Sequence, residues 1–173
     1  MSTRKFAGLI LCIAFSLGIT QATVRNNDSN ALKAIHDDLD RTGWVITASA
    51  FKDNNQDPPK SIDNNPNSRW TTGGFQKGGE WLMLDLQTPQ KFDVIELNQR
   101  NSQSDYPRSY EVYVSKDGKE WGKAIATGVG TKGEATVITL SKEIDTRYVK
   151  IVQTGKSGEN WWSVFEIFLK KTR

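Results

Sequence analysis

Cysteine and histidine are nearly absent from this sequence. Its 173 residues include one cysteine, Cys12, and one histidine, His36. A disulfide within the chain and a zinc cluster built from these two residue types are therefore excluded. The nucleophile motifs of hydrolases and the glycine-rich loops that cradle phosphates are absent as well. Adjacent carboxylates such as Asp37 and Asp38 are typical of a solvated face, so we expect a protein that is not an enzyme.

Long apolar runs are also scarce, with one exception at the N-terminus. Arg4 and Lys5 precede the apolar residues 6–19, a run that is too short to span a bilayer. Residues 20–22 then offer the small side chains that a signal peptidase reads. We therefore predict a signal peptide over residues 1–22. The mature chain is expected to be secreted, extracellular or periplasmic, with no membrane insertion after cleavage.

A strong charge of one sign is missing too. The formal net charge is +3, and loss of Arg4 and Lys5 with the signal peptide would leave +1. Such a balance gives no reason to expect nucleic acid as a partner. Tryptophan, in contrast, is abundant, with six residues in the chain. Its large flat face is most valuable where it packs or binds.

Residues 23–42 are predicted to form a polar leader with one short amphipathic helix. Leu32, Ile35 and Leu39 recur at helical spacing, and Gly43 could end the helix. His36 lies on a polar stretch of this segment, where a solvated side chain is the usual outcome.

Residues 43–171 read as strands. Period-two alternation and β-branched or aromatic residues predict about eight strands, with no helix between them. Pro89 separates two of these strands, and Asp117 with Gly118 marks a tight turn. This pattern favours an all-β fold, an antiparallel jelly-roll β-sandwich.

The segment "SIDNNPNSRW", residues 61–70, gathers carboxylate, amide and hydroxyl oxygens in one loop. Calcium takes six to eight oxygen ligands, so a loop of this kind could wrap one ion. The alternative is a plain turn held by its own asparagine and aspartate side chains. We expect Trp70 to pack in the core and Arg69 to pair with Asp85 or Glu166.

Four segments carry a family resemblance: "SIDNNPNSRWTT", "GGEWLMLDLQ", "YPRSYEVYVSKDGKEW" and "TRYVKIVQTGKSGENWWSVFEI". In order and spacing they resemble the discoidin domain, also called the coagulation factor V/VIII type C domain. Within that galactose-binding-domain-like superfamily they look most similar to family 32 carbohydrate-binding modules. The resemblance implies one jelly-roll domain over residues 43–171 that contains a structural calcium ion.

The resemblance also implies the calcium ligands. They are Asp63 and Glu166 through carboxylates, Asn65 in place of a family aspartate, Ser68 in place of a threonine, and a backbone carbonyl of Lys60 or Ser61. Asn64 and Asn65 stand where the family has Gly-Asp, which removes one charge from the loop. Asparagine tolerates positive φ, so the turn is expected to survive the loss of glycine.

Three loops correspond to the family's sugar-binding end: residues 71–77, 100–107 and 156–162. The implied ligand contacts are Thr71, Phe75, Arg100, Asn101, Asp105, Asn160, Trp161 and Trp162. One of the two adjacent tryptophans must point inward, and Trp161 is expected to be the exposed one. Thr71 stands in place of the family's histidine, so a glycan other than galactose stays open, including an acidic one attracted by Arg100, Lys77 and Lys156.

The resemblance therefore predicts a secreted, non-catalytic module that binds a glycan. The alternative is a discoidin domain that adheres to a protein or a cell surface. Lipid binding is less favoured, because the end loops offer only Phe75 and Tyr106 as apolar side chains.

Overall fold

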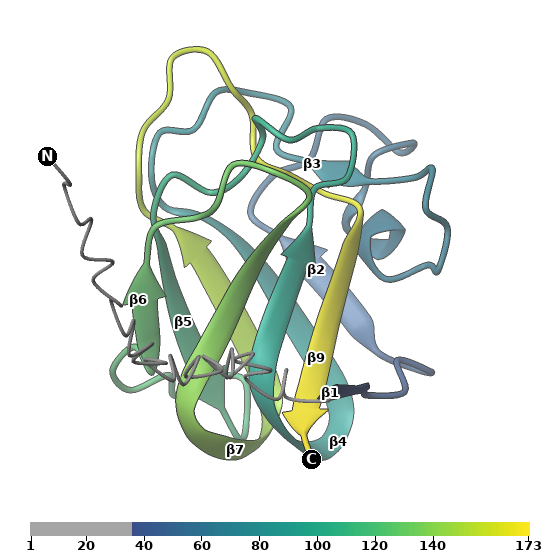
Figure 1. Ribbon diagram of the computed structural model, residues 1–173, viewed down its shortest axis with the longest axis vertical. Coiled ribbons are helices and arrows are strands. Elements are labelled where there is room, and N and C mark those ends of the chain that lie inside the picture. The colour runs from purple at the N-terminus through teal and green to yellow at the C-terminus, as the bar shows by residue number, and fades with distance from the viewer. Residues whose placement is uncertain (1–35) are drawn as a thin grey trace, which may run out of the picture. The chain divides into compact units, whose positions relative to one another are not determined.

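The computed structural model describes residues 36–173. In chain order the elements are β1 (His36–Asp38), β2 (Val45–Ala48), the short 3-10 helix η1 (Pro58–Ser61), β3 (Trp70–Thr71), β4 (Glu80–Asn98), β5 (Tyr110–Ser115), β6 (Ala126–Gly128), β7 (Ala135–Gln153), β8 (Ser163–Val164) and β9 (Glu166–Thr172). Every strand pair is antiparallel, and the fold is the predicted jelly-roll β-sandwich (Figure 1).

Two long bent strands, β4 and β7, run through both layers of the sandwich. The first half of β4 pairs with β2 and with the second half of β7, whereas its second half pairs with β9 and with the first half of β7. The ladder between them is interrupted between Asp85 and Gln90, and Gln87 has a φ of 67°. The strands predicted on either side of Pro89 are therefore one strand, which bends where its pairing lapses.

The core lies between the two layers. Along β4 the leucines, such as Leu82 and Leu84, are buried, and the residues between them, such as Trp81 and Met83, are half-buried. This is the alternation expected of a strand with one face on a core. Trp70 is fully buried, as predicted.

The N-terminal helix is a wrong prediction for the residues that can be compared. His36–Asp38 form strand β1, which pairs with Thr172, Lys171 and Lys170 of β9. The edge of β9 offers unpaired backbone groups, and a helix of a few residues is marginal by itself, so pairing wins. Leu39 extends the contact by donating its N–H to the Leu169 carbonyl at 2.9 Å. Residues 1–35, with the predicted signal peptide and the start of the leader, lie outside the described residues.

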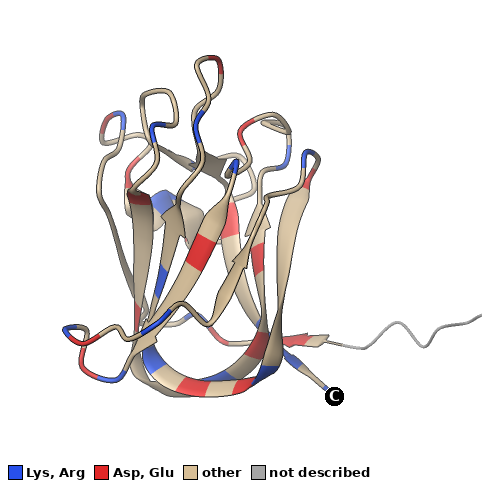
Figure 2. Ribbon diagram, turned by 90° about the vertical axis from the view of Figure 1, so that its left-hand side faces the viewer, with Lys and Arg blue, Asp and Glu red and all other residues tan. Residues whose placement is uncertain are grey.

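Charges of both signs are interspersed over the domain. Figure 2 shows basic and acidic residues over the loops at the top and around the foot of the sandwich. Lys170 lies in one such group, 2.8 Å from Glu96 and 3.3 Å from Asp38, and these carboxylates raise its pKa above the usual value although burial opposes them. Among the described residues, no helix has the length and apolar character needed to cross a bilayer.

The turn after β5 is built around the Asp117 carboxylate. Its Oδ1 accepts hydrogen bonds from the backbone N–H groups of Lys119 and Glu120, at 2.9 and 3.0 Å, and from Ser115 Oγ at 2.9 Å. These bonds, the two backbone ones first, lower the pKa of Asp117 to about 2. Gly118 follows with a φ of 72°, so the predicted turn residues are in place.

A pH dependence follows from this turn. Because the folded state lowers the pKa of Asp117 below its unfolded value of about 3.9, the carboxylate stabilises the fold at pH 5, and this contribution is lost as the pH falls towards 2. We expect the stability difference between wild type and Asp117→Asn to shrink between pH 4 and pH 2 in denaturant titrations. A difference that stays constant over this interval would show that the turn does not depend on the charge.

The tryptophan pair gives a second prediction. Trp162 is fully buried and meets Trp70 edge to face, with ring centroids 4.9 Å apart. Trp162→Ala is expected to lower the free energy of unfolding by about 3–5 kcal/mol, because it leaves a cavity in the core. Trp161→Ala, one residue away at the half-buried position, should cost clearly less. Equal losses in a urea titration would contradict this assignment of the pair.

Candidate ligand-binding site and cation loop

Three loops gather at one end of the sandwich, at the top of Figure 1. They are residues 72–79 between β3 and β4, residues 99–109 between β4 and β5, and residues 154–162 between β7 and β8. The chain between β2 and β3 joins them, since Lys52 donates its N–H to the Thr71 carbonyl at 3.1 Å. Segments far apart in the sequence therefore build one surface.

The Gln76 amide fastens these loops to one another. Its Nε2 donates to the carbonyls of Trp161, at 2.9 Å, and Tyr106, at 3.0 Å. Its Oε1 accepts from the Arg108 N–H at 3.0 Å and from the side-chain amide of Gln153. Gln76 is only 2% exposed, so each of these bonds is shielded from water. One side chain thus fixes the relative positions of two loops and strand β7.

Glycines allow the loops to approach this closely. A Cβ at Gly155 would lie 2.5 Å from the Arg108 Cβ, and one at Gly73 would lie 2.7 Å from the Lys52 Cα. Gly73 also has a φ of 70°, which favours glycine. The loop surface is therefore packed as tightly as a core.

A group of polar and aromatic side chains lies around this amide. We call it the Trp161 cluster: Lys52, Tyr106, Arg108, Asn160 and Trp161. The Lys52 ammonium is 5.9 Å from the centroid of the Trp161 ring. The Arg108 guanidinium lies 3.9 Å above the Tyr106 ring and donates to Asn160 Oδ1 at 2.5 Å. The cluster combines a half-buried indole with two cations and an amide.

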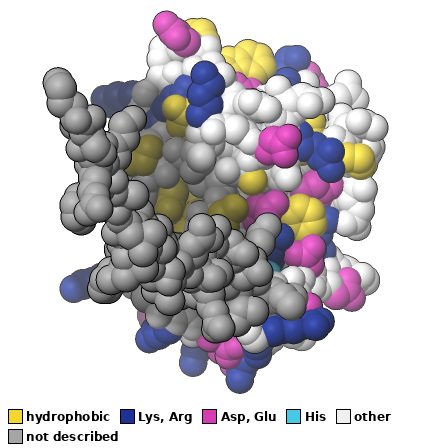
Figure 3. Space-filling view, in the orientation of Figure 1, with side chains coloured by type: hydrophobic (Ala, Val, Ile, Leu, Met, Phe, Trp, Pro, Cys, Tyr) yellow, Lys and Arg dark blue, Asp and Glu magenta, His cyan; other side chains and the backbone are white. Residues whose placement is uncertain are grey.

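Arg108 keeps unused hydrogen-bonding capacity. Its Nη2 donates to Asn160 and, at 3.1 Å, to the Ser104 carbonyl. Its Nη1 is buried and has no partner among the described residues. Figure 3 shows hydrophobic and basic side chains next to each other at this end of the face in view. The arrangement can therefore offer the Trp161 ring and the Lys52 ammonium to one ligand, with Arg108 holding Asn160 in place.

The structure brings some of the predicted ligand contacts to this end of the sandwich. Trp161 is half-buried and Trp162 fully buried, as expected of adjacent residues on opposite sides of the chain. Asn160 belongs to the cluster, and Phe75, which precedes Gln76, is 49% exposed. Two predicted contacts are wrong, because Trp162 and Thr71 are fully buried and cannot reach a ligand at the surface.

Arg100, Asn101 and Asp105 occupy other positions. The backbone N–H of Arg100 donates to the Glu134 carbonyl at 3.1 Å, which ties it to the β6–β7 connection. Arg100 and Asn101 are exposed, and in residues 36–173 no hydrogen bond or ion pair joins them to the Trp161 cluster. Asp105 accepts a hydrogen bond from Ser163 Oγ at 2.7 Å, which fastens the loop of residues 99–109 to strand β8.

Sequence reasoning missed Lys52, Gln76 and Arg108. Arg108 lies two residues before β5 in "YPRSYEV", and its position close to a strand start and to aromatic residues was the available signal. Lys52 and Gln76 carried no such signal, because their roles depend on contacts between loops that are distant in the chain.

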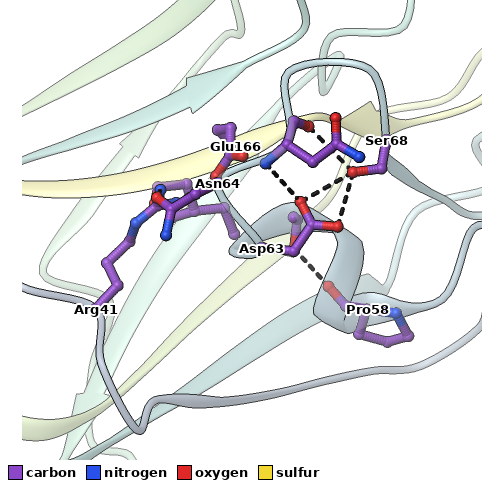
Figure 4. A network of polar contacts seen from close by, with 9 residues as sticks. Arg41, Pro58, Asp63, Asn64, Ser68 and Glu166 are labelled. Carbon is purple, nitrogen blue, oxygen red and sulfur yellow. Dashed lines mark hydrogen bonds and ion pairs between the residues drawn. The ribbon is translucent and has the colours of Figure 1, made fainter.

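The predicted cation loop forms a compact group of oxygens. Ser68 Oγ lies 2.8 and 2.9 Å from the two Asp63 carboxylate oxygens and 3.0 Å from the Asn65 carbonyl. Asn64 has a φ of 60°, so asparagine adopts the left-handed turn conformation that was expected of it at this position. The Lys60 ammonium lies 3.9 Å from the Asp63 carboxylate and so partly offsets its negative charge. Figure 4 shows this network.

Glu166 lies beside this loop and is held by Arg41. The two side chains are 5% and 7% exposed, and Arg41 Nη1 donates to Glu166 Oε2. The other oxygen, Oε1, is buried and has no partner among the described residues. The expected pairing of Arg69 with Glu166 or Asp85 is wrong, since Asp85 pairs with Arg147 at 2.7 Å.

This donor set fits a hard cation. No group of three or more His, Cys, Asp or Glu side chains that could hold a metal occurs within residues 36–173. An ion here would depend on the carboxylates of Asp63 and Glu166 together with hydroxyl and carbonyl oxygens, which are the ligands that calcium accepts. The unpartnered Glu166 Oε1 is the observation that favours an ion over a plain turn.

Comparison with protein families gives one match over most of the chain. The F5/8 type C domain matches residues 45–167. A curated relative, galactose oxidase from Gibberella zeae, is 27% identical over 161 residues, which cover 89% of this chain and 24% of the relative. The chain therefore spans about a quarter of that protein's length.

Solved structures with the same fold include two modules that bind sugars. One is a family 32 carbohydrate-binding module from C. perfringens NanJ, solved in complex with galactose, with a TM-score of 0.66 at 22% identity over 79% of this chain and 100% of that chain. Another is the chitosan-binding module 1 of a chitosanase/glucanase from Paenibacillus sp. IK-5, with a TM-score of 0.62 at 21% identity over 72% of this chain and 92% of that chain. At this identity the likeness shows the fold.

The Gln76 amide provides a test of the loop arrangement. Gln76→Leu leaves its buried partners without hydrogen bonds, so we expect the free energy of unfolding to fall by about 3 kcal/mol or more. Phe75→Ser, at the adjacent exposed position, should change it by less than about 0.5 kcal/mol. Urea titrations of both variants would measure this, and a Gln76→Leu variant as stable as wild type would contradict the role of the amide.

Proposed function

Because the chain belongs to the F5/8 type C domain family, we propose that it is a non-catalytic carbohydrate-binding module whose glycan lies on the Trp161 cluster. One observation carries the proposal. At the loop end of the sandwich, the half-buried Trp161 indole lies 5.9 Å from the Lys52 ammonium, the Trp161 carbonyl accepts from Gln76, and the neighbouring Asn160 is bonded to Arg108.

The chemistry of the cluster suits a sugar. The C–H face of a pyranose ring packs on a flat aromatic side chain, while its hydroxyl groups need a few well-placed polar partners. Trp161 supplies the flat face. The Lys52 ammonium and the Asn160 side-chain NH₂ supply donors, and Arg108 positions Asn160 through its Oδ1. The rigid loops reduce the entropy lost on binding.

The charge of the cluster favours a glycan that carries acidic groups. Its two charged side chains, Lys52 and Arg108, are cationic, although Asp53 lies 3.8 Å from the Lys52 ammonium and offsets part of that charge. We propose that uronate-containing oligosaccharides bind at least as tightly as neutral galactosides. The oxidase activity of the curated relatives is not carried over to this chain, which spans 24% and 20% of their length.

Two further parts of the proposal rest on the sequence and the cation loop. A calcium ion, held by Asp63, Asn65, Ser68, Glu166 and a backbone carbonyl of Lys60 or Ser61, would stabilise the end of the sandwich next to β9. Residues 1–22 would direct export, which makes extracellular glycans the available ligands.

Binding is tested with Trp161→Ala. Loss of the stacking face is expected to weaken glycan affinity about tenfold or more, measured by affinity electrophoresis and calorimetry against galactoside, chitosan and uronate oligosaccharides. Arg108→Met should weaken binding in the same assays. Trp121→Ala is the matched control, because this half-buried tryptophan lies in the β5–β6 connection with Lys150 3.9 Å above its ring, outside the loop end.

Two results would contradict the proposal. One is a Trp161→Ala protein that binds as wild type does. The other is a folded wild-type protein that binds no glycan of the panel, which would favour the alternative of adhesion to a protein or cell surface through exposed loop residues such as Phe75.

A further inference from the structure

Arg41 is a buried cation that the sugar site does not use. It lies between β1 and β2, four residues before the part of the chain that the family matches. Its Nη1 donates to Glu166 Oε2 and, at 3.1 Å, to the Ile167 carbonyl. Its guanidinium lies 4.5 Å from the centroid of the Phe168 ring. Arg41 is therefore fixed against β9 by three independent contacts.

The same guanidinium also holds the cation loop. Arg41 Nη2 donates to Asn64 Oδ1, and Asn64 stands between the two predicted ligands Asp63 and Asn65. Figure 4 shows the Arg41 side chain reaching Asn64 and Glu166 from the opposite side to Asp63 and Ser68. One positive charge thus connects the loop to strand β9, which is the connection that a bound ion would also make.

The charges around the loop are already balanced without an ion. The two carboxylates, Asp63 and Glu166, each have a basic partner, Lys60 at 3.9 Å and Arg41 in direct contact. The Arg41–Glu166 pair is almost fully buried, so water does little to screen it. An ion on Glu166 Oε1 would share one carboxylate with the guanidinium.

We propose that Arg41 is an internal counter-ion for the cation loop, which lets the fold stand without calcium and lowers the loop's affinity for it. This rests on the proposal that the loop can bind calcium. Repulsion between two cations that flank one carboxylate is worth on the order of a thousandfold in a binding constant. Arg41 also orients Glu166, which would raise the loop's affinity for calcium, but by only about 10–100-fold. The repulsion is therefore the larger effect, and the net result of Arg41 is a lower affinity of the loop for calcium.

The test compares Arg41→Gln with Arg41→Lys. Both side chains can donate a hydrogen bond to Glu166, but only lysine keeps the charge. Purified in calcium and then dialysed against chelator, Arg41→Gln is expected to lose thermal stability and to recover it on addition of calcium, with an affinity at least tenfold above that of wild type. Arg41→Lys should respond as weakly as wild type. Calorimetry and thermal unfolding with and without calcium measure both effects.

Each outcome decides between the proposals. A calcium response that is large in Arg41→Gln and small in wild type supports the counter-ion, even if wild type binds no calcium at all. A response in wild type that falls in Arg41→Gln would overturn the counter-ion and leave the calcium site standing. No response in any of the three proteins would overturn both. Glu166→Gln introduced into the Arg41→Gln variant removes the carboxylate that would hold the ion, and this control should abolish the gained response.

Discussion

The hydrogen bonds of the Gln76 side chain are the constraint on which the loop end depends. An amide has two donors and one acceptor oxygen, and here both ends are used against partners from two other loops and from β7. A buried amide hydrogen bond contributes only modestly to the free energy of unfolding. Breaking it is much more destabilising, because the lost bond leaves a desolvated polar group without a partner. The loops therefore behave as an extension of the sandwich, and the side chains that they carry are held in place before any ligand arrives.

Beside β9 the structure depends on ion pairs and not on neutral amide hydrogen bonds. There the chain joins its N-terminal segment to the sheet through charge, with Arg41 on Glu166, Lys170 between Asp38 and Glu96, and Arg173 2.5 Å from Asp37. The exposed pairs contribute little, whereas the buried one is costly to break. A fold without disulfides thus uses a polar network at one end and a buried ion pair at the side.

Much of the fold followed from the sequence, because alternation and motif order are local signals. The jelly roll, the inward Trp162 and the positive φ of Asn64 were all predictable in this way. The helix was wrongly predicted because the spacing of Leu32, Ile35 and Leu39 is helical, whereas His36–Asp38 pair with the free edge of β9, which only the tertiary fold provides. The prediction of two separate strands on either side of Pro89 was wrong, because one long strand can bend where its hydrogen-bonded ladder is interrupted.

The candidate site was harder to predict. Trp161 and Asn160 could be read from the chain, whereas Arg108 and Lys52 become partners of the indole only through contacts across loops. The family pattern points to Arg100, whose backbone N–H donates to the Glu134 carbonyl instead of joining the cluster. Residues that act through distant partners leave no periodic or compositional trace.

The central claim is that recognition takes place on the Trp161 cluster, and nuclear magnetic resonance can test it directly. In a titration of isotope-labelled protein with a binding oligosaccharide, the Trp161 indole N–H and the Gln76 side-chain amide should shift, while the Trp81 and Trp121 indoles on the sheet side stay in place. Shifts confined to Trp81 and Trp121, with Trp161 and Gln76 unchanged, would contradict the account.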